Sequence, residues 1–270
     1  MSDGTYAISP ARIGAMVLRY WYLFRGSWPR IFELIYWPTI MMVLWGFISV
    51  HLRNDSSWVA TAFGVFISGV LLWDVLFRGQ LGYSISFLEE MWSRNLGQLF
   101  VSPLRPVELI VALMTISLIR TTIGVVPAAL LAIPLYAFNV FELGLPLVAF
   151  YVNLLVFAWA MGGIITGLLL RLGLGAESLA WLAIFLLAPI SCIYYPLDVL
   201  PFWLQWVAQC FPMVYVFEGM RSVLFDGVFR WDYLGAAVAL NVVYLGIGAT
   251  VFLWSFEDAR KRGALLNTGE

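Results

Sequence analysis

The chain has few of the side chains on which most enzyme chemistry depends. Its 270 residues contain one histidine, His51, and one lysine, Lys261. A histidine-based metal cluster and a Ser-His-Asp triad therefore lack parts. No GxxxxGK[ST] motif surrounds Lys261, so the sequence predicts no Walker A loop for ATP on this chain. The two cysteines, Cys192 and Cys210, lie in or beside apolar segments without a CxxC or Cys/His spacing, which favours inert packing.

Charge is also scarce. Only 11% of the residues are charged and 62% are hydrophobic, whereas about a quarter of an ordinary soluble domain is charged. This composition excludes a water-soluble protein. The net charge of −1 and the scattered basic residues give no basis for nucleic-acid binding. The sequence predicts an all-α integral membrane protein with a single transmembrane domain over residues 1–270.

Several apolar runs are long enough to cross a hydrocarbon core of about 30 Å, which needs roughly 20 helical residues. Six transmembrane helices are predicted, at residues 31–50, 58–77, 107–135, 145–170, 179–195 and 233–256. An earlier run, at residues 10–26, is too short to span. Arg12 and Arg19 share one side of this helix and Met16 and Tyr20 lie on another, which is typical of an interfacial helix.

The basic residues beside the spans predict the orientation. They number eleven on one side and three on the other. The larger group comprises Arg12, Arg19, Arg25, Arg30, Arg78, Arg94, Arg105, Arg171, Arg260, Lys261 and Arg262, and the smaller comprises Arg53, Arg221 and Arg230. The positive-inside rule then places both chain ends in the cytoplasm, and six spans satisfy the even number that this requires. We expect a multi-pass protein of the cell (inner or plasma) membrane.

The connection between the second and third spans predicts an amphipathic cytoplasmic helix at residues 86–101. Ser86 and Glu89 have the spacing of a capping box, and Pro103 and Pro106 separate this helix from the third span. The polar face comprises Glu89, Glu90, Arg94 and Gln98. Two roles are open from this pattern: a helix that only covers the bundle, and a docking surface for a cytoplasmic partner.

The segment at residues 196–230 is too apolar for a solvated loop, yet prolines cut it into pieces of roughly 10 residues that cannot span. Short re-entrant helices on the outer side satisfy both constraints. Its aromatic residues fit an interfacial belt and the lining of a pore mouth equally well. The aromatic residues expected at this outer mouth are Tyr194, Tyr195, Phe202 and Trp203.

Some ionisable and small residues inside the spans have structural explanations, and for one of them a functional role is equally supported. Asp74 and Arg78 stand one turn apart, as in a local ion pair. Arg120 lies near the middle of the third span, where a structural ion pair and a role in a translocation path are equally supported. The fourth span carries small residues that favour close internal helix packing over a dimer seam, namely Ala158, Gly162, Gly163 and Gly167.

The order of these parts resembles the type-2 ABC exporter permease family. Two stretches carry the resemblance, and they cover residues 90–105 and 191–221. The first contains Arg94, Leu99 and Ser102-Pro103-Leu104, and the second contains Tyr195-Pro196-Leu197, Leu200-Pro201, Trp203, Phe211-Pro212, Tyr215, Glu218 and Arg221. Cys192 is a departure, because the family often has glycine shortly before its aromatic-Pro pair.

The resemblance implies a non-catalytic permease subunit of an ATP-driven exporter for a glycan, lipid-linked or drug-like substrate. It implies a homodimeric or heterodimeric pore and two copies of a separate ATPase, which would hold ATP and Mg. The ATPase would dock under residues 87–101, with Glu89, Glu90, Arg94 and Gln98 as coupling residues. The translocation path or outer gate would include Arg120, Tyr194, Tyr195, Phe202, Trp203, Glu218 and Arg221.

Two other function classes rank below this one. An ion-coupled carrier is expected to show inverted repeats and membrane-embedded carboxylates, but the sequence shows no clear repeat and Arg78 accounts for Asp74. A membrane-embedded enzyme needs grouped catalytic side chains, and no helix face collects them.

Overall fold

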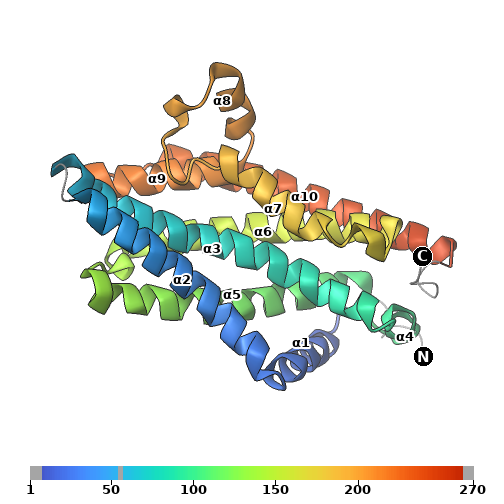
Figure 1. The fold of residues 1–270 in the computed structure, drawn as a ribbon. Helices are drawn as coiled ribbons and strands as arrows, with labels where there is room; N and C mark the ends of the chain where they lie inside the picture. The colour runs from blue at the N-terminus through green and yellow to red at the C-terminus, as the bar shows by residue number, and fades with distance from the viewer. Residues whose placement is uncertain (1–7, 54–56, 264–270) are drawn as a thin grey trace.

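The computed structural model describes residues 8–53 and 57–263, and every regular element within these ranges is helical (Figure 1). Five long helices form the bundle: α2 (Trp28–Arg53), α3 (Ser57–Trp92), α5 (Pro106–Tyr136), α6 (Leu145–Leu172) and α10 (Trp231–Lys261). Within the described residues, each of the five contains a stretch long and apolar enough to cross a bilayer. The chain is therefore a multi-pass membrane protein.

These helices confirm four of the predicted spans directly. Residues 31–50, 107–135, 145–170 and 233–256 lie within α2, α5, α6 and α10. Each prediction rested on a mainly apolar run of about 20 residues or more, the length that a helix needs to cross a bilayer. The first helix, α1 (Pro10–Arg25), also follows the predicted range of 10–26 closely.

The separate helix predicted at residues 86–101 is wrong. Residues 86–92 are the end of α3, and a turn joins them to the short α4 (Leu96–Val101). Ser86 caps nothing, because its hydroxyl donates to the Gly82 carbonyl at 2.8 Å within α3. The helix α3 also packs closely on α6 in this region, because a Cβ on Gly79 would lie 2.7 Å from the Ala158 methyl of α6. The predicted span at 58–77 is only part of this helix.

The length of α3 places α4 at one end of the bundle. A helix of 36 residues is about 54 Å long, well beyond a hydrocarbon core of about 30 Å. The N-terminal end of α1 and the C-terminal end of α10 lie at the same end of the bundle as α4 (Figure 1).

The predicted span at 179–195 is wrong at its C-terminal end. Its helical part is α7 (Leu179–Leu187), preceded by the 3-10 turn η2 (Leu174–Ala176) and followed by η3 (Ala188–Ile190). Residues 174–190 form a shorter apolar helix than the five long ones. Pro189 removes a helical donor at this point, and the following residues leave the helix.

The proline-broken segment forms the short helices that the sequence predicted. They are the 3-10 turn η4 (Leu197–Val199), α8 (Phe202–Gln209) and α9 (Pro212–Asp226). Each begins directly after or at a proline, which has the fixed φ of a first helical turn. Figure 1 shows α8 standing out from the side of the bundle, while α9 packs against α3, α6 and α10.

The small residues of α6 serve internal packing, as predicted. Gly162 faces the Tyr83 ring of α3, and Gly163 faces the backbone of Gly248 in α10. A Cβ on Gly248 would lie 2.5 Å from the Ala160 carbonyl oxygen. Close backbone contact of this kind is a common way for membrane helices to associate.

We expect Gly248→Ala to lower the free energy of unfolding by about 1–3 kcal/mol, the usual cost of overpacking. Gly246→Ala is the matched control, because a Cβ there meets nothing within 4 Å and alanine is the better helix former. Thermal unfolding in detergent, followed by size-exclusion fluorescence, measures both variants. Equal melting temperatures for the two would contradict the close α6–α10 contact.

Candidate coupling site

One face of α1 is buried against the end of the bundle that carries α4. Met16, Tyr20 and Phe24, spaced four residues apart, are its buried side chains, and α1 packs mainly on α5 and on the start of α2. Burial raises the pKa of Tyr20 well above its ordinary value, and the neighbouring Glu90 carboxylate raises this pKa further. The amphipathic character predicted for α1 is confirmed.

Glu108, the third residue of α5, fixes the beginning of α1. Its side chain is fully buried and accepts hydrogen bonds from the backbone N–H of Ser9 at 2.8 Å and of Arg105 at 3.0 Å. Arg12 donates from Nε to the same carboxylate at 2.8 Å, and this carboxylate raises the pKa of Arg12. Glu108 therefore caps α5 and ties it to α1.

Glu90 ties the middle of α1 to the end of α3. Its carboxylate is buried and lies 2.7 Å from a guanidinium nitrogen of Arg19. The Asn95 amide donates to it at 2.8 Å from the turn after α3. The prediction that Glu90 lies on an exposed face is wrong, because α3 continues as a helix here and turns this residue towards α1.

Glu89 and Arg120 belong to the same network. Glu89 lies 3.1 Å from a guanidinium nitrogen of Arg30 and 3.7 Å from one of Arg120. Arg120 also donates to the Ser86 hydroxyl at 2.8 Å and lies over the Phe24 ring at 5.6 Å. The structure thus supplies the ion-pair partner that the structural role of Arg120 requires. It likewise pairs Asp74 with Arg78, at 3.8 Å.

The turn and short helix after α3 form an exposed tip, which we define as residues 92–103. Arg94 and Gln98, two of the predicted coupling residues, are exposed there, and Val101 is 87% exposed. Arg94 has a φ of 53°, in the left-handed region that ends helices. The Trp92 indole donates to the Glu177 carboxylate at 3.0 Å, which ties the tip to the turn between η2 and α7.

The predicted gate residues Glu218 and Arg221 hold the non-helical segment at residues 191–196, which we call the α7–α8 connection. Arg221 donates to the carbonyls of Ile193 and Tyr195 at 3.0 and 2.8 Å and also to that of Cys192. Glu218 accepts from Arg221 at 2.8 Å and from the backbone N–H of Leu197 at 2.8 Å. Cys192, the residue that departs from the family's glycine, has a φ of 58°, a conformation that glycine adopts readily.

The four aromatic residues predicted at the outer mouth do not form one cluster. Tyr194 stacks on Trp45 of α2 with ring centroids 4.4 Å apart, and the Tyr195 hydroxyl donates to the Pro189 carbonyl. Phe202 and Trp203 are exposed on α8. An interfacial belt and the lining of a pore mouth both stay open for them.

The sequence reasoning missed Glu108, Asn95 and the pairing of three arginines. Arg12, Arg19 and Arg30 served to predict the orientation, and the first two also the amphipathic first helix, yet each contacts a carboxylate of the α3–α5 region. The position of Glu108 was a usable signal, because an acidic residue at the third position after a proline-led helix start is typical of a cap.

The sequence of this chain was compared with those of known families. The family described as "ABC-2 type transporter" matches residues 12–225, which run from α1 almost to the end of α9. The comparison with curated proteins gives no match.

Proposed function

The chain belongs to the ABC-2 type transporter family, and we propose that it forms the path through which an ATP-driven exporter moves a glycan, lipid-linked or drug-like substrate. As a permease subunit of this family it works with an ATP-binding subunit in a membrane.

The observation that carries the proposal is the exposed tip at residues 92–103. It stands at the end of a helix about 54 Å long and presents Arg94, Gln98 and the apolar Val101 to solvent. Exposed apolar residues beside charged ones are typical of a protein contact surface. We assign the docking of the ATP-binding subunit to this tip, with Arg94 and Gln98 as contact residues.

Glu89 and Glu90 take a different part in coupling. Both pair with arginines of α1 or α2, so they lie behind the docking surface. A displacement of the tip would pass through Glu90 and Arg19 to α1, and through Glu89 to Arg30 at the beginning of α2. These ion pairs are the connection by which closure of the ATP-binding subunits would move the bundle.

The topology that fits this assignment has six crossings. The short helix at residues 174–190 adds one to the five long helices, and an even number places both chain ends on the side of the tip. We propose that this side is cytoplasmic and that two permease subunits pair around the path with two ATP-binding subunits. The α8 and α9 region then lies at the outer side.

We expect the double substitution Arg94→Glu and Gln98→Glu to weaken binding of the ATP-binding subunit about tenfold, which corresponds to about 1.4 kcal/mol. The stimulation of ATP hydrolysis by substrate should fall with it. The matched control is Arg260→Glu, a charge reversal at an exposed residue at the same end of the bundle.

Titration of the purified permease with its ATP-binding subunit measures the binding, and ATP hydrolysis in proteoliposomes measures the coupling. Retained folding is checked by gel filtration. Unchanged binding and coupling in the double variant would reject the tip as the docking surface.

A further inference from the structure

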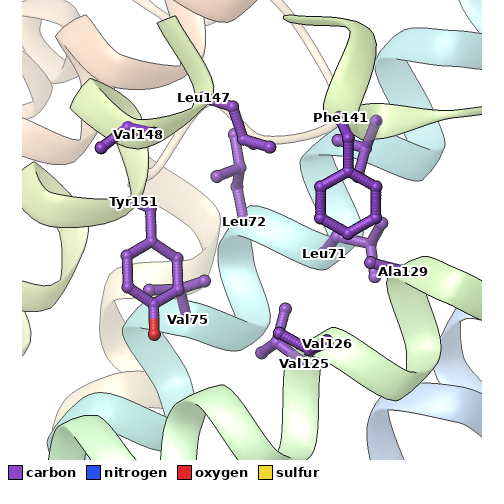
Figure 2. Close-up of a pocket in the computed structure, with 11 residues that line it drawn as sticks. Leu71, Leu72, Val75, Val125, Val126, Ala129, Phe141, Leu147, Val148 and Tyr151 are labelled. Atoms are coloured by element: carbon purple, nitrogen blue, oxygen red, sulfur yellow. The ribbon is translucent and has the colours of Figure 1, made fainter. Parts of the chain in front are cut away.

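An apolar cavity lies between α3, α5, α6 and the 3-10 turn η1 (Val140–Leu143). The helix α3 packs against both α5 and α6, whereas α5 and α6 touch each other at few places. The space between them has a volume of about 240 Å³. Figure 2 shows Val75, Val125, Ala129 and Leu147 directed towards this space from three helices.

The wall of the cavity is hydrocarbon. Among its lining residues only Tyr151 carries a polar side-chain group, and its hydroxyl is hydrogen-bonded to that of Thr122 at 2.9 Å. A water molecule needs two to four polar partners, so an apolar cavity of this kind stays dry. If the cavity were left empty, the side chains that line it would lose dispersion contacts on one side. Apolar cavities of about 150 Å³ bind benzene, and this one is larger.

The surroundings of the cavity supply hydrocarbon. Val148 and Phe141 line it and are also exposed on the outside of the bundle, where a membrane protein meets acyl chains. Val125 stands eleven residues before the end of α5, so the cavity reaches about 16 Å below that end. This depth is close to half of a core of about 30 Å, which is the thickness of one leaflet.

We propose that this cavity binds one acyl chain of a bilayer lipid, taken from the leaflet nearest the α5–α6 connection. The acyl chain enters sideways between α5 and α6 and replaces the helix contact that these two helices lack. The headgroup of the lipid stays at the membrane surface. The lipid site is separate from the tip and from the α7–α8 connection. The proposal requires only that the bundle lies in a bilayer.

The test uses the full chain in nanodiscs that contain phosphatidylcholine with a photoreactive diazirine on one acyl chain. After irradiation, mass spectrometry locates the labelled peptides. We expect strong labelling at residues 125–129 and 147–151. Ala129→Phe fills the cavity and should reduce labelling at 147–151 at least fivefold. Leu130→Phe is the matched control, because the neighbouring Leu130 is 51% exposed and does not line the cavity, and its labelling should equal the wild type.

Three results would overturn the proposal. The first is even labelling over the whole outer surface, and the second is unchanged labelling of residues 147–151 in Ala129→Phe. The third is labelling that disappears when the complete transporter is assembled, which would assign the cavity to a protein segment. Should Ala129→Phe fail to fold, Val126→Phe replaces it, since Val126 also lines the cavity. The docking test at residues 92–103 is independent of all these outcomes.

Discussion

Replacing Glu108 with alanine is expected to release α1 from the bundle and to lower the free energy of unfolding by about 3 kcal/mol. The substitution removes the cap of α5 and leaves the Arg12 guanidinium and the N–H groups of Ser9 and Arg105 without this acceptor. The value is at the lower end for a broken buried pair, because the Arg12 side chain is 28% exposed and water compensates part of the loss. Thermal unfolding of the purified protein gives the stability change.

The release of α1 has its own measurement. Trypsin should cut after Arg19 much faster in Glu108→Ala than in the wild type, because α1 then leaves its packed position. Glu108→Gln should give an intermediate result, since its amide oxygen still accepts one backbone hydrogen bond. The control is Glu257→Ala, at an exposed carboxylate near the end of α10. Wild-type cleavage of Glu108→Ala would mean that other contacts hold α1.

Hydropathy alone predicted four of the five long helices, because an apolar run of bilayer length has only one stable backbone conformation in lipid. The amphipathic α1 was predicted from the sides of the helix on which its arginines and apolar residues fall. The prolines at positions 196, 201 and 212 likewise predicted where short helices begin. These features depend on local sequence, so they could be predicted without knowledge of any distant contact.

The continuation of α3 could not be predicted in this way. The predicted span ended at residue 77, but Arg78, Gln80 and Ser84 beyond it are buried. Inside the bundle, Gln80 donates to the Ser84 hydroxyl at 3.1 Å and Arg78 lies 3.8 Å from the Asp74 carboxylate. The partners that turn Glu90 and Glu108 inward are distant in sequence, at Arg19 and Arg12, so no periodicity of a single helix reveals them.

Replacing Arg221 with methionine is expected to cost about 3–5 kcal/mol, the usual result of breaking a buried ion pair. The Arg221 side chain is only 9% exposed, and methionine would leave Glu218 and the carbonyls of Ile193 and Tyr195 without their donor. The melting temperature of the purified permease should fall strongly, and transport in proteoliposomes should fall in proportion to the remaining folded protein.

Two further variants separate the structural role of Arg221 from a role in the translocation path. Arg221→Lys keeps the charge but loses the planar fork that reaches several acceptors at once, so it should recover only part of the stability. Arg230→Met, at an exposed arginine directly before α10, should leave stability unchanged. If Arg221→Met instead melted like the wild type while the substrate preference of the transporter changed, Arg221 would face the transported molecule. Other contacts would then hold the α7–α8 connection.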